Sequence, residues 1–419
     1  MKERSDPVLV IATLWLLVFA AASQIMIIAP ILPRIAEELS VEKSALGLLM
    51  TIYAVSVGVF ALIAGPISDR FGRRRILLVG AGLLAVTLGL HAFANTFAVL
   101  LLVRGLAGAA GGMLSGAAVS YVGDYFPVHQ RGWASGWVMS GIAAGQILGV
   151  PLGNLLADWL GFRAPFLAFS IVAAVAFLFI WFRLPQPNVK LGESLSVRSA
   201  LLGYGVLLRR SEVRAASGAF LAMFMGISLF VTFFPTWLEE YLGFSAFMVS
   251  MLYLVGGVAN VIAGPRAGKL SDRIGRTTVI IGASVGVALL MPITTLVQPT
   301  FSWVIYPLFF LTMAFVASRM SPMQALMTQL ATGAQRGTLM SLVTSIGQIG
   351  FGMGSAFASA VWRLFGFTGN AIVAMVSVLL MAGIVWQYLR KVELRMLEEE
   401  LIEGEQMGEA GVPALTRHL

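Results

Sequence analysis

The 419-residue chain contains no cysteine and only three histidines. The missing thiols exclude disulfides, thiolate metal sites and cysteine nucleophiles. We also find no nucleotide-binding loop, no metal-ligand cluster and no nucleophile beside a base, so we expect no metal and no cofactor. These absences argue against an enzyme and against a pump driven by nucleotide hydrolysis.

Charge is scarce as well, at 11% of residues against roughly 25% in an ordinary soluble domain. Hydrophobic residues make up 58% of the chain, and the mean hydropathy is +0.88. Apolar stretches of about 20 residues recur throughout, each long enough to cross a hydrocarbon core of about 30 Å as a helix. Because these stretches do not alternate with polar residues, the sequence predicts an all-α integral membrane protein rather than a barrel.

Twelve membrane spans are predicted. The first apolar run, Val8 to Ile28, is followed by Pro30 and Pro33 rather than by a small-residue cleavage site, so we interpret it as a retained span. The predicted spans begin near Val8, Ala45, Ile76, Phe97, Gly132, Ala164, Ala215, Phe247, Thr277, Phe301, Thr338 and Thr368.

Lysine and arginine fall mostly on alternate loops, which the positive-inside rule places in the cytoplasm together with both termini. The net charge of +8 is then a matter of topology in the cytoplasmic membrane, and we expect no nucleic-acid partner. The opposite loops combine acids with a few basic residues: Glu37, Glu38, Glu42, Glu239 and Glu240 with Arg34, Lys43, Arg163 and Arg363.

The longest polar stretch separates two related halves. We predict an N-terminal half over 1–183, a cytoplasmic linker over 184–213, a C-terminal half over 214–389 and a cytoplasmic tail over 390–419. The segment 65–73 recurs as 268–276, and the pair Gly161-Phe162 recurs as Gly366-Phe367, a spacing of 366 − 161 = 205. Two parallel repeats with a solute site between them near the midplane are a recurrent plan of transporters that work by alternating access.

The loop after the second span reads Gly65-Pro-Ile-Ser-Asp69-Arg70-Phe-Gly72-Arg73. It resembles the signature loop of the major facilitator superfamily, which implies a twelve-helix fold in two pseudo-symmetric halves. The resemblance also implies a conformational latch that stabilises the outward-open state, whereas a short loop of topogenic arginines is the alternative. The implied latch residues are Gly65, Asp69, Arg70, Gly72, Arg73 and Asp124, with the second copy at Asp272, Arg273 and Arg276.

The fifth span carries glycines at four-residue intervals, which form a smooth face that lets a neighbouring helix approach closely. The pattern resembles the antiporter motif of the twelve-span drug/proton antiporters, whose glycine face meets span 8, and this favours efflux. Ordinary helix packing is the alternative. The residues of this motif are Gly141, Gly145, Gly149, Pro151 and Gly153.

Two arginines interrupt predicted spans, and each costs at least about 2.5 to 3.5 kcal/mol by insertion scales. Arg104 in span 4 matches an Arg-Gly motif that the resemblance links to proton transfer, so we predict Arg104 and Asp124 to take part in proton or charge coupling. A structural Arg104 that extends toward the membrane interface is the alternative. Arg319 either binds an anionic or strongly polar solute group or caps helix carbonyls ahead of Pro322.

No acid falls at the centre of a span, and Gln24 occupies the place where many drug/proton antiporters carry one. Polar side chains within the spans suit hydrogen bonding to a solute, although bonds between helices are the alternative for each of them. The predicted substrate-binding residues are Gln24, Asn260, Arg319 and Gln348.

We therefore expect a monomeric secondary transporter that exports a small amphipathic or organic solute in exchange for protons. A uniporter or symporter of an organic anion or sugar-like metabolite, which would use the embedded arginines, stays open because no central acid is present. A non-transporting membrane receptor is the remote alternative.

Overall fold

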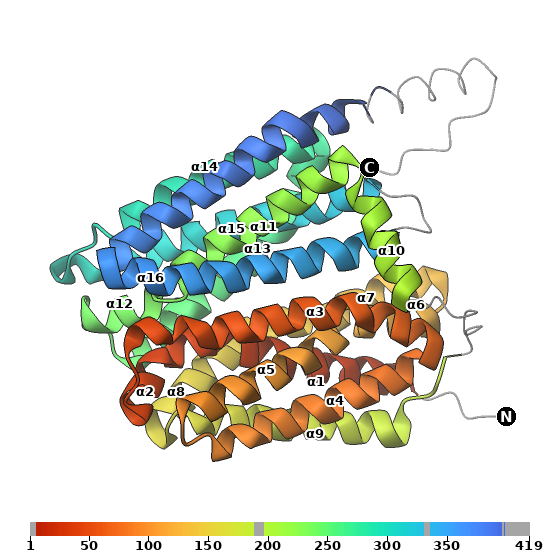
Figure 1. Ribbon diagram of the computed structural model, residues 1–419, viewed down its shortest axis with the longest axis horizontal. Coiled ribbons are helices and arrows are strands. Elements are labelled where there is room, and N and C mark those ends of the chain that lie inside the picture. Colours follow the sequence, from red (N-terminus) through yellow and green to blue (C-terminus); the bar gives the residue numbers. More distant parts are fainter. Residues whose placement is uncertain (1–5, 188–196, 331–335, 396–397, 399–419) are drawn as a thin grey trace.

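The computed structural model describes residues 6–187, 197–330, 336–395 and 398, and for 65, 66, 69, 70, 128, 197–201 and 336 it describes the backbone only. Within these ranges the chain is helical and contains no strand, as predicted (Figure 1). Most of the predicted tail, 390–419, lies outside the described residues.

The first six spans are built from helices that begin within four residues of the predicted starts. Their bounds are α1 Pro7–Met26, α3 Gly47–Phe71, α4 Arg73–Leu90, α5 Phe97–Leu114 continued by α6 Ala117–Tyr125, α7 Val128–Ala144 continued by η3 Gly145–Gly149 and α8 Val150–Leu160, and α9 Arg163–Arg183. Short helices α2 Ile28–Leu39, η1 Lys43–Ala45 and η2 His91–Phe93 connect them.

The second six spans follow a helix, α10 Val197–Leu208, that lies inside the predicted linker. Their helices are α11 Ser211–Val231, α12 Phe234–Glu240, α13 Ala246–Ile274, α14 Arg276–Thr294, η4 Pro299–Val304, α15 Ile305–Gln329, α16 Arg336–Ile384 and η5 Val385–Leu389.

The described residues contain eleven apolar helical segments long enough to cross a membrane, and the last of these covers two spans. It comprises 59 residues, which would extend over roughly 90 Å as one straight helix, about three times the hydrocarbon thickness of a bilayer. The helix breaks at Gly366, whose φ of 63° and ψ of −162° are not helical. The chain therefore crosses the membrane twelve times, in agreement with the prediction.

The internal repeat is visible in the backbone as well as in the sequence. Gly72 ends α3 with φ 93° and ψ 143°, and Gly275 ends α13 with φ 93° and ψ 140°. Likewise Gly161 (φ 87°) and Gly366 (φ 63°) occupy matching turns, and the phenylalanine after each of them is buried. Glycine is suited to these four turns because a side chain is strained at positive φ.

Two bundles pack against each other along two seams (Figure 1). In one seam α3 packs on α16, and in the other η3 and α8 pack on α13. At one end of the molecule α2 lies beside α12, and we call this end the α2–α12 face. At the other end, the linker face, α10 packs on α3 and α16, and Tyr204 donates a hydrogen bond to the Leu62 carbonyl (2.9 Å).

Candidate functional site

A polar cluster lies in the core of the first bundle, around Arg104 on α5. Arg104 Nη1 donates to Gln24 Oε1 (3.0 Å), and Gln24 Nε2 donates to the hydroxyl of Tyr53 (2.8 Å). The guanidinium also lies 4.3 Å from the centroid of the Tyr53 ring, a favourable arrangement for a cation. Arg104 is 0% exposed, so it does not extend to the interface, and that alternative is wrong.

This cluster joins two of the predicted site residues, Gln24 and Arg104, across α1 and α5. Tyr53 on α3 completes it, and the sequence alone did not indicate that role. The ring and the amide partly replace the water that Arg104 gives up, because both present electron-rich groups to the cation. Gln24 therefore already has partners within its own half, rather than a free amide.

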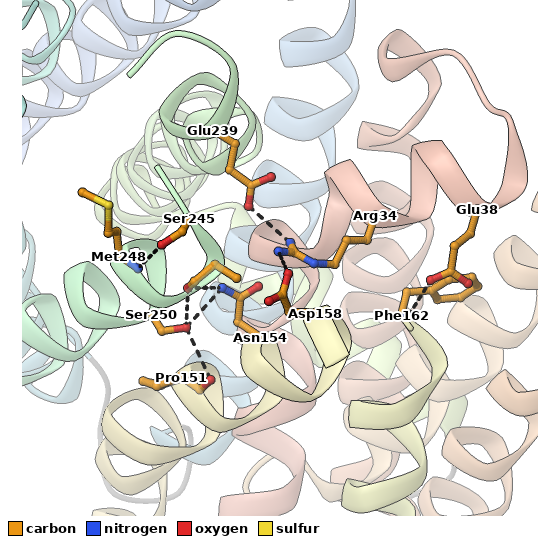
Figure 2. A network of polar contacts seen from close by, with 11 residues as sticks. Arg34, Glu38, Pro151, Asn154, Asp158, Phe162, Glu239, Ser245, Met248 and Ser250 are labelled. Carbon is orange, nitrogen blue, oxygen red and sulfur yellow. Dashed lines mark hydrogen bonds and ion pairs between the residues drawn. The ribbon is translucent and has the colours of Figure 1, made fainter. Parts of the chain in front are cut away.

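The seam between span 5 and span 8 carries two amide contacts. Asn260 Nδ2 donates to Gln146 Oε1 (2.8 Å), while Asn260 Oδ1 has no hydrogen-bond partner among the described residues. Nearer the α2–α12 face, Asn154 Nδ2 donates to the Ala246 carbonyl (2.9 Å) and to the hydroxyl of Ser250 (3.2 Å), as Figure 2 shows. Asn260, predicted to bind solute, thus links the two halves.

The glycine face of span 5 has a different partner from the one that the resemblance implied. A Cβ added at Gly141 would lie 2.9 Å from the carbonyl of Trp15, and one at Gly149 would lie 2.1 Å from the hydroxyl of Ser23, both on α1. A Cβ added at Gly145 would likewise contact α1, and one added at Gly153 would contact Ile27, the residue that follows α1. The expected contact with span 8 is therefore wrong for this face, although the prediction of close helix packing fits it.

Span 8 approaches span 5 through its own glycine, since a Cβ at Gly257 would lie 2.7 Å from the side chain of Ile147. This contact falls on η3, a single π-helical turn over Gly145–Gly149. Pro151 accounts for the wide turn, because its ring would clash with a carbonyl four residues earlier and it has no N–H to donate. Sequence reasoning identified the proline but not the π-helical turn.

Gln348, on α16, is half-buried beside α3. Its Cβ lies 3.5 Å from the position that a Cβ would take at Gly58. Gln348 therefore lies on the first seam, and the structure does not bring it into contact with the Arg104 cluster through any described hydrogen bond.

Arg319, on α15, is 0% exposed, and its three guanidinium nitrogens have no hydrogen-bond partner among the described residues. The helix runs without interruption through Pro322. Capping of carbonyls ahead of Pro322 is therefore wrong, because no carbonyl in the described part of the chain accepts from Arg319.

At the linker face, the predicted latch residues are only partly described. Arg73 Nε pairs with Asp124 Oδ2 (2.9 Å), and Arg73 Nη1 donates to Ser68 Oγ (3.0 Å). Only the backbone of Gly65, Asp69 and Arg70 is described, so the partners of the Asp69 and Arg70 side chains are not assigned.

The second copy of this loop is built differently. Asp272 and Arg273 are exposed, whereas the carboxylate of Glu393 accepts hydrogen bonds from the backbone amides of Arg276 (2.6 Å) and Thr277 (3.0 Å). A carboxylate there stabilises the start of α14, since the first amides of a helix have no partner within the helix. Gln186 occupies the corresponding place in the first half, with its amide 2.5 Å from where a Cβ of Gly72 would lie.

At the α2–α12 face, ion pairs join the two halves. Arg34 binds Asp158 (2.8 Å) in its own half and Glu239 (3.2 Å) in the other, as Figure 2 shows. Burial alone would lower the pKa of Arg34, but the two carboxylates together raise it above its ordinary value. Lys43 also pairs with Glu240 across the halves.

A further ion pair orders the loop after span 5. Glu38 binds Arg163 (2.8 Å) and accepts from the backbone amide of Phe162 (2.8 Å). These acids and bases lie on loops predicted to share one side of the membrane, and that shared side was the signal for their pairing. The partners themselves could not be assigned from the sequence.

Twelve membrane-crossing helices are arranged in two repeats. Buried polar clusters lie between these helices, and ion pairs lie at both ends of the molecule, as in a secondary transporter. The profile of the Major Facilitator Superfamily matches residues 14–355 and 219–399. The chain therefore belongs to this superfamily, as the signature loop suggested. It is accordingly a multi-pass membrane transporter of small solutes and not an enzyme.

Relatives and solved structures agree with this assignment. The chain is 29% identical over 392 residues to the multidrug resistance protein MdtG of Salmonella typhi and to that of Salmonella newport, covering 90% of this chain and 94% of each relative. A D-xylose-proton symporter superposes with a TM-score of 0.74 at 19% identity, covering 91% of this chain and 97% of the other. The human organic anion transporter MFSD10 (TETRAN) superposes with a TM-score of 0.67 at 20% identity, covering 91% and 100%. Both structures share the fold.

Proposed function

We propose that this transporter exports a small amphipathic solute across the cytoplasmic membrane in exchange for protons. The observation that carries the proposal is the similarity, along nine-tenths of the chain, to proteins named for multidrug resistance. The four-residue spacing of glycines in span 5 resembles the antiporter motif in sequence and supports the same direction of transport, although this face packs on α1.

The linker face is then cytoplasmic and the α2–α12 face is external, as the distribution of lysine and arginine favours. In this orientation the ion pairs of Arg34 and Lys43 hold the external side closed. On the same side Thr51 donates to the Gly352 carbonyl (2.9 Å) across the first seam. The proposed cycle opens these external contacts while the cytoplasmic contacts of the two halves close.

Coupling to protons is proposed to involve Asp124 and Arg104. Protonation of Asp124 would remove the charge that holds Arg73, and this would free α4 from the end of α6 on the cytoplasmic side. Arg104 would set the charge of the central cluster, through which Gln24 senses the solute. Gln24, Asn260, Gln348 and Arg319 are the proposed solute contacts, in a carrier that works as a monomer.

Proteoliposomes loaded with labelled compounds, with and without an imposed pH gradient, test this function. We expect amphipathic compounds to move against their own gradient when protons flow in the opposite direction. Movement only down the solute gradient, unaffected by pH, would contradict the exchange and identify a facilitator.

A second candidate, a carrier of organic anions, is favoured by one observation, the guanidinium of Arg319, which finds no partner within the described ranges of the chain. The same proteoliposomes distinguish it, because anionic compounds would then be transported and cationic ones would not.

A further inference from the structure

We propose that Arg319 is the binding site for the anionic group of the transported solute, an organic oxoanion such as a carboxylate on an apolar body. The inference rests on the proposed transport of a small solute and deepens its second candidate, the carrier of organic anions, by naming the residue that binds the anionic group. It begins from a fully buried guanidinium whose three nitrogens lack a partner among the described residues.

Arg319 lies at the centre of the buried stripe of α15. Thr312 precedes it by seven residues and Leu326 follows it by seven, so the three side chains leave the same face of the helix, and all three are buried. The position is therefore inside the bundle and not at the lipid surface. Arg319 cannot reach water without a change in the packing of the helices around it.

The packing around this stripe changes at Arg319. On the side toward the α2–α12 face, Phe309 and Met313 belong to one apolar cluster, and on the linker side Met323 and Leu326 belong to another. Arg319 thus occupies a polar break between two apolar regions. A ligand that neutralises it there would have apolar side chains on either side, which suits an anion with an apolar body.

Contacts between α15 and the neighbouring helix α13 show where this break lies along the length of the bundle. Tyr306 on α15 donates to the Met248 carbonyl (3.3 Å), and a Cβ at Gly268 would lie 3.0 Å from the hydroxyl of Ser321. Arg319 and Asn260 both lie in the stretch between these two contacts. Arg319 lies two residues before Ser321, whereas Asn260 lies eight residues before Gly268, so the break is closer to the linker face than the Asn260–Gln146 contact between the halves.

Arg104, the other arginine within a span, is a useful comparison because its guanidinium has partners inside the protein. Arg104 donates to Gln24 and lies over the ring of Tyr53, so its charge has partners within the chain. Arg319 has no such group, and none of the ion pairs that the structure describes involves it. A buried charge without a partner is unfavourable, and a bound anion would supply the counter-charge that the described residues do not.

The geometry of a guanidinium selects among anions. Its planar fork of donors matches the two oxygens of a carboxylate or the oxygens of a tetrahedral oxoanion, whereas a halide can accept from it only as a point charge. Amphipathic cations are disfavoured at this site by repulsion. The site therefore predicts selectivity for the sign of the solute charge.

Binding of radiolabelled octanoate to the full chain in phosphatidylcholine nanodiscs tests the inference, with octyltrimethylammonium as the cationic probe of the same length. We expect saturable octanoate binding that Arg319→Gln weakens by roughly tenfold or more, because a charge-assisted hydrogen bond is lost. Arg319→Lys should bind at intermediate strength, since it keeps the charge and loses the fork. Arg266→Gln on α13, which removes an exposed arginine bonded to its own helix (2.9 Å), is the matched control and should bind as the unaltered protein does.

A second measurement separates a binding role from a structural one. In the absence of any organic anion, Arg319→Met should raise the melting temperature, because it removes an uncompensated buried charge, whereas the loss of a structural contact would lower it. A lowered melting temperature, unchanged octanoate binding in Arg319→Gln, or equal binding of the cationic probe would each overturn the proposal.

Two further additions identify the source of the anion. Octanoate that is displaced by phosphatidylglycerol in the nanodiscs would assign Arg319 to a lipid headgroup and overturn the solute site. Displacement by octanoate analogues at far lower concentration than by acetate or chloride would support it. Because binding needs no gradient, failed proton-driven export with intact octanoate binding would contradict the proposed exchange and leave the site unaffected.

Discussion

Replacing Glu239 with glutamine should shift the protein toward a state that is open at the α2–α12 face. Arg34 binds two carboxylates, but only the contact with Glu239 joins the two halves. The substitution keeps an oxygen that can accept a hydrogen bond and removes the charge. It therefore weakens the closed face without altering the packing of either bundle.

The size of the shift follows from the burial of this pair. The side chains of Arg34 and Glu239 are 14% and 19% exposed, so the pair is screened less than a surface ion pair, which contributes about 0.2 to 1 kcal/mol. Hydrogen bonds to charged groups contribute about 1.5 to 3 kcal/mol. We expect a loss of about 1 to 2 kcal/mol, which changes the ratio of open to closed molecules by roughly 5- to 30-fold.

Pulsed EPR distances across the face would measure this ratio. The chain has no cysteine, so Phe93→Cys and Phe301→Cys introduce the only two labelling sites. Both side chains are exposed, at 73% and 61%, and they lie in different halves beside the α2–α12 face. The fraction of the longer distance should rise in Glu239→Gln.

Asp158→Asn is the matched control, because it removes the partner of Arg34 within the same half and leaves the contact between halves. It should not increase the open fraction. An equal increase in Asp158→Asn, or no change in Glu239→Gln, would refute the reasoning. The exchanged pair Arg34→Glu with Glu239→Arg should restore the closed state in part, although Asp158 then faces a like charge.

Three other substitutions have expected outcomes. Gly149→Ala should reduce the free energy of unfolding by about 1 to 3 kcal/mol, seen as a lower melting temperature in detergent, because the added methyl group would overlap a hydroxyl on α1. Gly136→Ala on the same span has free space around it and should not lower the melting temperature. Equal effects of the two substitutions would contradict the close packing at Gly149. Glu393→Gln should destabilise the start of α14 by about 1 kcal/mol, measurable as faster amide exchange there, and unchanged exchange would mean that the carboxylate is not its cap. Arg73→Gln should slow transport while solute affinity stays nearly unchanged, and Asp124→Asn should match it; loss of affinity instead would assign the pair to the solute site.

Much of the fold could be predicted from the sequence because the features that determine it each lie within one short segment of the chain. Long apolar runs fix the number of spans, and glycines repeated at constant spacing, such as Gly161 and Gly366, mark turns that need positive φ. These features are local, so one chain is enough to reveal them. The helix α10 was missed because its twelve mostly apolar residues are too few to cross a membrane and lie between polar flanks.

The site was predictable only in part, since its partners come from different helices. A charge within an apolar run, such as Arg104, is visible in the sequence, but the rotation and depth of neighbouring helices decide that Gln24 and Tyr53 meet it. The same limitation explains the glycine face of span 5. Four-residue spacing shows that some helix approaches closely there, but not that this helix is α1.

The matching turns at Gly72 and Gly275 are what an origin of the two halves by duplication would leave. A chain that arose by duplication would have begun with two identical turns, and their backbones still agree within a few degrees. At the side chain that reaches each turn they have diverged, to the neutral Gln186 in one half and the acidic Glu393 in the other. The two turns therefore share one backbone conformation but are contacted by different side-chain chemistry, a neutral amide in the first half and a carboxylate in the second.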